Sequence, residues 1–376
     1  MVLLAGPRQC GKTTVAKAFV EERKGRYYSW DRLQDRRTIQ AYELDAGARL
    51  WAFDELHKYR RWRGFLKSAY DEFGDERSIL VTGSARLELY GRGGDSLQGR
   101  YFPHRLHPFT LAEILGRNFE WERFRREQFE SEPGAVSVLK DMHRLGGFPE
   151  PFLSGSDRTA ARWRLAYGTR LVREDVRDLE RVQDLDRMEL FYDRLSEVVG
   201  APLSINALRE DLEVAFATVK NWLSIFERLY GVFRLPPFGA PRVRAVKKES
   251  KLYFWDWARV AEPAQRFENL VAAHLLRLCH WLEDVEGKRC ELRYFRTATG
   301  QEVDFIVVER RKPLFAVECK ATERPVDSGL AYFLERFGKM PAYQVCLEGE
   351  RDVVARSRSG ARVRVLPAAR FLAQMP

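Results

Sequence analysis

The chain has 376 residues, of which 45% are hydrophobic and 31% charged, and its formal net charge is +10. This length fits two or three domains rather than one core, and the composition excludes a globally disordered chain. No apolar run approaches the ~20 residues that a membrane-spanning helix needs, and no signal-peptide cleavage site follows the first strand. We therefore expect a cytoplasmic protein without a membrane partner.

The charge balance and the cysteine content bear on partners and metals. Lys and Arg total 64 against 54 Asp and Glu, which favours a polyanionic partner such as DNA, although genomic base composition can produce the same arginine excess. The five cysteines are odd in number and form no CxxC pair. This pattern argues against a disulfide framework and against a zinc site.

The predicted elements begin with short apolar strands that alternate with helical segments over residues 1–116, which is typical of a parallel α/β sheet. The strands are expected at Val2–Ala5, Tyr27–Trp30, Leu50–Phe53 and Ser78–Thr82. Charged helical sequence covers residues 117–195, with a break at 146–149, and short helices follow over 196–240. Residues 241–376 return to strands around one helix at 267–278. We predict four domains with these bounds.

The first loop carries the strongest motif of the chain. It matches G-x-x-x-x-G-K-[ST] between a predicted strand and a predicted helix, with the residues Gly6, Pro7, Arg8, Gln9, Cys10, Gly11, Lys12, Thr13 and, opening the helix, Thr14. Backbone N–H groups of such a loop converge on phosphates, Lys12 reaches the β and γ oxygens, and the Thr13 hydroxyl ligates Mg²⁺. The pattern predicts a site for ATP and Mg²⁺ rather than a plain glycine turn with a solvated lysine.

Two acids end the third predicted strand, at Asp54 and Glu55. A carboxylate in the position of Asp54 can hold the water shell of Mg²⁺. Glu55 would then orient and deprotonate the attacking water, which predicts hydrolysis and not only binding. The alternative is an ordinary acidic strand end at the surface.

Two further positions are candidates for sensing and stabilising phosphate charge. The fourth strand ends in small polar residues, so the hydroxyl of Ser84 or Thr82 could lie near the γ-phosphate, although either could equally be a cap or turn residue. Arg100 is a candidate arginine finger, acting within the chain or across the interface of a homo-oligomer. A surface arginine is an equal alternative for Arg100.

The helical segment from residue 203 to 235 is similar to a winged helix-turn-helix. Its exposed helix face and the following wing are expected to contact DNA phosphates through Thr218, Lys220, Asn221, Arg242, Arg244, Lys247, Lys248 and Lys251. Winged helices also serve as ATPase lids and as docking modules, so a protein partner remains an alternative.

The C-terminal part holds a second constellation, on two predicted strands at residues 302–308 and 314–321. Because strand side chains alternate, Glu318 and Lys320 share one face, and Asp304 on the adjoining strand can meet them. Two carboxylates and a lysine can hold Mg²⁺ and orient a water for phosphodiester attack. The set resembles a PD-(D/E)xK nuclease core, in which Glu268 is the acid that often precedes the motif. An ion-paired hairpin in a fold retained for binding is the alternative.

Several short sequence motifs together resemble those of a bacterial and archaeal family of AAA+-like P-loop ATPases with a C-terminal domain of unknown function. They are Gly6 to Thr14, Asp54 to Lys58, Val81 to Ala85, Gly99-Arg100, His107 to Thr110 and Gly146 to Glu150. The resemblance implies ATP hydrolysis in a fold allied to the signal-transducing and AAA+ ATPases, with Pro149 in a turn that borders the adenine. The fold expected is a parallel-sheet α/β P-loop ATPase with a helical lid, a winged helix and a restriction-endonuclease-like α/β domain.

The sequence is compatible with three alternative functions. The first is a Mg²⁺-dependent ATPase that couples ATP binding and hydrolysis to DNA binding or remodelling. The second is a metal-dependent DNA nuclease regulated by nucleotide. The third is a signalling scaffold that ATP switches and that binds a protein through its helical middle.

Overall fold

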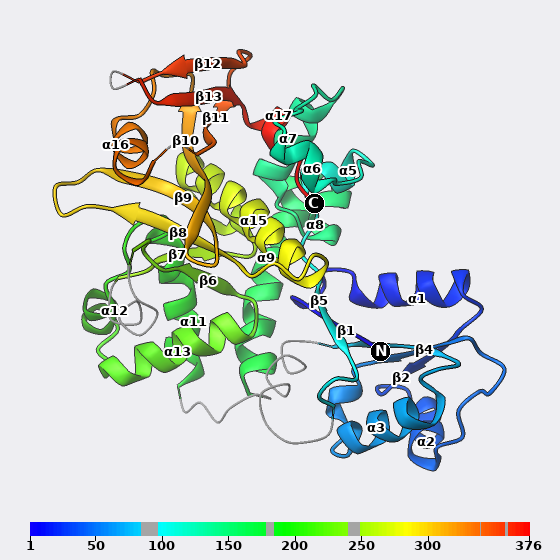
Figure 1. Ribbon diagram of the computed structural model, residues 1–376. Helices are drawn as coiled ribbons and strands as arrows, with labels where there is room; N and C mark the ends of the chain where they lie inside the picture. Colours follow the sequence, from blue (N-terminus) through cyan, green and yellow to red (C-terminus); the bar gives the residue numbers. More distant parts are fainter. Residues whose placement is uncertain (84–96, 178–183, 240–248, 339, 358–359) are drawn as a thin grey trace. The chain divides into compact units, whose positions relative to one another are not determined.

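The computed structural model describes residues 1–83, 97–177, 184–239, 249–338, 340–357 and 360–376. Two compact units are present: Met1–His107 with Arg228–Tyr230, and Pro108–Glu227 with Gly231–Pro376 (Figure 1). No described helix has the length and apolar character needed to cross a membrane.

The first unit is built on a parallel sheet. Its described strands are β1 (Val2–Ala5), β2 (Arg26–Ser29), β3 (Leu50–Asp54), β4 (Ser78–Thr82) and β5 (Phe102–Arg105), in the spatial order β2-β3-β4-β1-β5. All neighbouring strands run parallel. Parallel sheets are covered on both faces, and β3 accordingly buries all five of its residues.

Helices cover both faces of this sheet. The elements are α1 (Lys12–Glu22), α2 (Leu33–Ala41), the 3₁₀ turn η1 (Leu56–Lys58) and α3 (Trp62–Phe73). Ala16 of α1 packs with Leu50 and Leu80 on one face, whereas Ile39 of α2 and Leu66 of α3 pack on the other (Figure 1). The carboxyl ends of the strands therefore meet at one edge, between the two helical layers.

The first part of the second unit is mainly helical. Its described elements are α5 (Leu111–Ile114), α6 (Trp121–Arg125), α7 (Ala135–Leu145), α8 (Pro149–Ser154), α9 (Asp157–Arg170), the π-helical segment η2 (Leu171–Val176), α11 (Leu185–Arg194), the 3₁₀ turn η3 (Leu195–Glu197), α12 (Ile205–Asp211) and α13 (Phe216–Arg228). An antiparallel pair follows, β6 (Val232–Leu235) with β7 (Lys251–Phe254). This pair spans the predicted domain boundary at residue 240.

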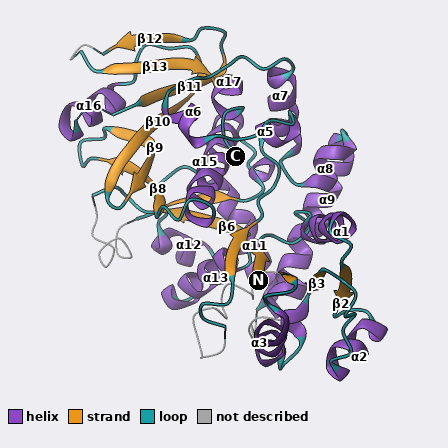
Figure 2. Ribbon diagram, turned by 45° about the vertical axis from the view of Figure 1, so that its right-hand side comes forward, coloured by secondary structure: helices purple, strands orange, loops and turns teal. Residues whose placement is uncertain are grey.

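A mixed sheet forms the C-terminal part of the second unit (Figure 2). Its described strands are β8 (Cys290–Arg296), β9 (Glu302–Glu309), β10 (Lys312–Thr322), β11 (Ala342–Glu348), β12 (Val353–Arg356) and β13 (Arg362–Pro367), in the order β12-β13-β11-β10-β9-β8. The accompanying elements are the 3₁₀ turn η4 (Trp257–Arg259), α15 (Pro263–Asp284), α16 (Ser328–Phe337) and α17 (Ala368–Leu372). The long helix α15 contacts β7, β8, β9 and β10, so it joins the small sheet to the large one.

Candidate functional site

The loop between β1 and α1 has the backbone geometry of a phosphate cradle. Gly6 and Gly11 have φ values of 154° and 101°, which favour glycine. A Cβ atom on Gly6 would lie 2.3 Å from the carbonyl oxygen of Leu106, so no larger residue fits there. Because α1 begins at Lys12, the unpaired N–H groups and the positive dipole end of its first turn face the loop.

Lys12 is held inside this loop. Its side chain is buried, and its Nζ donates hydrogen bonds to the carbonyl oxygens of Gly6, at 3.0 Å, and Pro7, at 2.6 Å. An ammonium group held this way is positioned to exchange its carbonyl partners for the charged oxygens of an incoming phosphate. The predicted role of Lys12 is compatible with this placement.

Asp54 is the centre of a hydroxyl network at the carboxyl ends of the strands. Its Oδ2 accepts from Thr13 Oγ1 at 2.8 Å and from Tyr27 Oη at 2.5 Å, and its Oδ1 accepts from Thr82 Oγ1 at 2.5 Å. These donors come from α1, β2 and β4. Burial, together with the hydrogen bond to Asp54, raises the pKa of the Tyr27 phenol well above its usual value, so Tyr27 stays a donor.

The oxygens of Thr13 and Asp54 suit Mg²⁺. A hydroxyl and a carboxylate are ligands that this ion prefers, and it completes its shell with waters and nucleotide phosphates. The hydrogen bond between Thr13 Oγ1 and Asp54 Oδ2 shows that both groups reach the mouth of the loop. The residues present therefore fit the ion that the motif implies.

Glu55 follows Asp54 in a left-handed conformation, with φ of 55°. Its Oε2 lies 3.3 Å from Lys58 Nζ and 3.7 Å from His57 Nε2. Burial raises the pKa of the Glu55 carboxyl, and the Lys58 ammonium opposes that shift. A carboxylate with a raised pKa is a better proton acceptor than an exposed one, which suits the predicted role of a general base.

The structure gives the remaining phosphate-site candidates different environments. Thr82 is fully buried on β4, while Ser84 lies outside the described residues. Arg100 forms a two-pronged ion pair with Asp71 of α3, with distances of 2.6 and 3.1 Å. To act as a finger, Arg100 would have to leave Asp71. Pro149 is the first residue of α8, in the second unit.

One of the predicted DNA-contact residues, Lys251, is buried. Lys220 and Asn221 are exposed on α13 and Thr218 is partly exposed, whereas Arg242, Arg244, Lys247 and Lys248 lie outside the described residues. Lys251 was expected on an exposed wing, and this prediction was wrong: its side chain is 1% exposed, on the buried strand β7. The reason is that acidic partners far along the chain surround its ammonium group.

The C-terminal motif residues do come together. The Asp304 N–H donates to Glu318 Oε2 at 3.3 Å, and Lys320 Nζ lies 2.7 Å from Glu318 Oε1. Glu268 of α15 lies at the same cluster and accepts from Tyr253 Oη at 2.7 Å. Burial raises the pKa of Glu268 to about 7 and that of Glu318 well above its usual range. Among the described residues, no group of three or more His, Cys, Asp or Glu side chains is arranged to hold a metal ion.

Sequence reasoning missed several residues of these sites, among them Tyr27 and Glu302. Tyr27 contributes a third hydroxyl to Asp54, and Glu302 contributes a further acid to the C-terminal cluster. Glu302 precedes Asp304 by two residues on one strand, so the strand period of two places both on the same face. That spacing was a signal for Glu302. The pairing of β2 with β3, which positions Tyr27, had no local signal.

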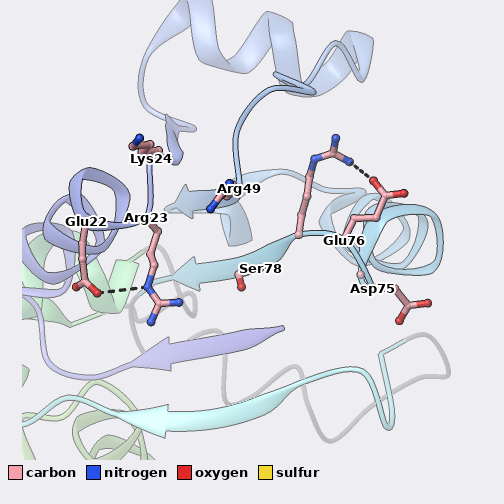
Figure 3. A pocket seen from close by; sticks show the side chains of 9 residues that line it. Glu22, Arg23, Lys24, Arg49, Asp75, Glu76 and Ser78 are labelled. Carbon is pink, nitrogen blue, oxygen red and sulfur yellow. Dashed lines mark hydrogen bonds and ion pairs between the residues drawn. The ribbon is translucent and has the colours of Figure 1, made fainter.

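A pocket of about 470 Å³ lies at the opposite edge of the parallel sheet (Figure 3). Lys24 precedes β2, Arg49 precedes β3 and Ser78 begins β4, so these lining residues lie at the amino ends of the strands. The phosphate loop follows the carboxyl end of β1. The pocket is therefore separate from the candidate nucleotide site.

Comparison with known proteins divides the chain into three matched regions. Residues 1–115 match a family described as an AAA domain. Residues 137–262 and 265–371 match two domains of unknown function (DUF8612 and DUF4143). The AAA match, the phosphate loop and the parallel sheet support a P-loop ATPase fold for the N-terminal region.

Similar full-length proteins have no described activity. An uncharacterized protein of Mycobacterium tuberculosis is 23% identical over 334 residues, which cover 86% of this chain and 71% of that protein. An uncharacterized protein of Methanocaldococcus jannaschii is 25% identical over 291 residues, which cover 68% of this chain and 60% of that protein.

The solved structures that match this chain include two with low TM-scores. The RuvB Holliday junction branch migration motor of Thermotoga maritima has a TM-score of 0.27 and 22% identity, over 62% of this chain and 82% of that one. The Aeropyrum pernix ORC1 protein, solved in complex with DNA, has a TM-score of 0.30 and 14% identity, over 72% and 86%.

Proposed function

We propose that this protein is a Mg²⁺-dependent ATPase that couples ATP binding and hydrolysis to DNA binding or remodelling. The observation that carries the ATPase part is the hydrogen bond of 2.8 Å between Thr13 and Asp54, beside a loop that holds Lys12. It joins the phosphate loop to the acid-bearing strand, which is the arrangement that phosphoryl transfer to water requires.

Each residue of the site has a distinct task in this proposal. The loop N–H groups and Lys12 bind the phosphates, and Thr13 and Asp54 hold the Mg²⁺. The ion supplies charge neutralisation on the β- and γ-phosphate oxygens. Glu55 accepts the proton of the attacking water, helped by its raised pKa.

Tyr27 and Thr82 contribute indirectly, through hydrogen bonds to Asp54. Their hydroxyls donate to opposite oxygens of its carboxylate, each at 2.5 Å. They hold the plane of the carboxylate fixed, because each oxygen accepts from a hydroxyl on a separate strand. Thr82 thereby acts on the phosphate site through Asp54.

The DNA part of the proposal rests on charge and exposure. The net charge is +10, and α13 presents Lys220 and Asn221 at its exposed face, with α12 preceding it by a short turn. A helix pair of this kind presents its second helix to a duplex. Polyanion binding by such a surface is electrostatic and does not require sequence readout.

The test measures phosphate release by the purified full chain with ATP and Mg²⁺, with and without duplex DNA. We expect Lys12→Ala and Glu55→Gln each to lower turnover by at least roughly 100-fold, because they remove phosphate binding and the proton acceptor respectively. Glu55→Gln should still bind ATP. Lys67→Ala, an exposed lysine of α3, is the matched control and should keep wild-type turnover.

Turnover that neither substitution changes would remove the ATPase proposal. If turnover falls in both variants but is the same with and without DNA, the ATPase proposal stands and only the proposed coupling to DNA is contradicted. In that case the ATP-switched scaffold with a protein partner is the function to test next.

A further inference from the structure

The C-terminal cluster contains a cation that belongs to the protein itself. Lys251 Nζ lies 2.6 Å from Glu302 Oε1, 3.3 Å from Glu268 Oε1 and 3.5 Å from Asp304 Oδ1. The lysine comes from β7 of the small sheet. Its acidic partners come from α15 and β9. One ammonium group therefore occupies the point on which three carboxylates converge.

These carboxylates include the ones that a PD-(D/E)xK site would use for a metal ion. Asp304 is one of the two motif acids of the resemblance, Glu318 being the other, and Glu268 is the acid that often precedes the motif. A Mg²⁺ ion there would need oxygen ligands at about 2.0–2.1 Å in an octahedral arrangement. With the Lys251 ammonium within 3.5 Å of Asp304 and Glu268, the ion and the ammonium would compete for the same oxygens and repel one another.

The carboxylates of the cluster also have other partners. Asp304 Oδ2 accepts from the Cys319 N–H at 3.0 Å, and Glu268 Oε1, which also faces Lys251, accepts from Tyr253 Oη. Glu318 Oε1 pairs with Lys320, whose ammonium also lies 2.9 Å from Asp327 Oδ2. Each acid of the motif thus has partners from the protein itself, as buried charges require.

Lys251 remains charged in this setting. Burial lowers its pKa, but Asp304, Glu268 and Glu302 raise it by more, so the net shift of the Lys251 pKa is upward. A neutral lysine would leave the carboxylates without compensation in a buried site.

We propose that the Lys251 ammonium replaces the divalent cation of a nuclease-like site, so that the C-terminal domain does not bind Mg²⁺ at Glu268 and Asp304 and does not cut DNA there. The cluster instead ties the strand β7 to α15 and β9. This inference is independent of the proposed ATPase, whose residues lie in the other unit.

The first measurement is a Mn²⁺ titration of the nucleotide-free full chain, followed by thermal unfolding and by Mn²⁺ paramagnetic resonance. We expect wild type and Asp304→Asn to bind Mn²⁺ identically. In Lys251→Ala the unfolding midpoint should fall by roughly 10 °C, because the carboxylates lose their cation. Mn²⁺ or Mg²⁺ should then restore much of that loss.

Two variants control this result. Lys140→Ala removes an exposed lysine of α7 and should change neither the midpoint nor its response to metal. Lys251→Ala combined with Asp304→Asn should lose the metal response that Lys251→Ala gains. Both comparisons use the whole protein without nucleotide, which keeps the phosphate-loop site out of the readout.

Three outcomes would overturn the proposal. One is a Mn²⁺ site in wild type that Asp304→Asn abolishes, a comparison that stands even if Lys251→Ala fails to fold. Another is a folded Lys251→Ala protein that gains no metal response. The third is Mg²⁺-dependent cutting of linear, branched or single-stranded DNA by wild type that Asp304→Asn abolishes.

Discussion

The environment of a buried charged side chain in this protein is set by partners from other elements of the fold. Asp54 and Lys251 are both buried charged residues. Three hydroxyls from α1, β2 and β4 surround Asp54, and three carboxylates from α15 and β9 surround Lys251. At Asp54 the surrounding hydroxyls hold the carboxylate in one orientation. In Lys251 the surrounding carboxylates keep an ammonium ionised. In our proposals, the first arrangement holds a bound cation and the second takes the place of one.

His274 is a residue whose titration should affect stability. The Leu111 N–H can only donate, so His274 Nε2 accepts it at 3.1 Å, and Nδ1 carries the proton that bonds to the Leu270 oxygen at 2.9 Å. Burial lowers the pKa of His274 to about 4, against about 6.5 when unfolded. Between these values the unfolded chain binds more protons. Stability is therefore full above pH 6.5 and falls as the pH drops toward 4.

The expected loss from His274 is about 3 kcal/mol across that window. Urea unfolding at pH 7, 6 and 5 measures it as a slope of unfolding free energy against pH. In His274→Gln the slope should be smaller, because the part of the pH dependence that comes from protonation of His274 is lost. Equal slopes in the two proteins would contradict the assignment of a neutral, buried His274.

At the scale of elements, the turn between α7 and α8 shows a glycine required by a close approach. A Cβ on Gly147 would lie 2.3 Å from Trp257 Cη2 and 2.9 Å from the Phe109 carbonyl oxygen. The same indole donates from Nε1 to the Met142 oxygen at 2.7 Å, and the Phe109 N–H donates to the Gly147 oxygen at 2.7 Å. The turn is thus locked against η4 and the segment before α5.

We expect Gly147→Ala to lower the free energy of unfolding by about 2 kcal/mol or more, since the added methyl must displace a buried indole or a backbone carbonyl. Denaturant unfolding followed by tryptophan fluorescence measures the change. Gly64→Ala on α3 is the control, because a Cβ there meets nothing within 4 Å and alanine favours a helix. A Gly147→Ala protein as stable as wild type would show that Trp257 and Phe109 can move away from the added methyl group without loss of unfolding free energy.

For the whole molecule, the net charge of +10 predicts how DNA affinity responds to salt. We expect the affinity for duplex DNA to fall by at least roughly 10-fold between 50 and 200 mM salt, because bound phosphates release counterions. Lys220→Ala should weaken binding and reduce the slope of log affinity against log salt by about 1. Fluorescence anisotropy with labelled duplex measures both quantities.

Lys67→Ala, on the first unit, should leave that slope unchanged. An affinity that does not vary with salt would show that phosphate contacts do not drive binding. It would favour the protein-binding scaffold over a DNA-coupled ATPase.

The strands that carry the motifs were predictable because their signals are local. The predicted bounds of β1 and β4 match the structure, β3 extends one residue further to include Asp54, and β2 begins and ends one residue earlier than predicted. Short apolar runs between turns define such strands without reference to the rest of the chain. The helix predicted at residues 267–278 is longer, at 263–284, because helix ends depend on capping and packing.

The sequence by itself determined the phosphate loop, the acids at the end of β3 and the strand pair that bears Asp304 and Glu318. Only the tertiary structure decided which partners these groups meet. Lys251 follows closely on Arg242 to Lys248, and by position alone it reads as part of a basic surface. Its partners Glu268 and Asp304 lie 17 and 53 residues further on. The energy of a buried charge depends on such distant neighbours, so local composition cannot reveal whether a lysine faces solvent or replaces a metal ion.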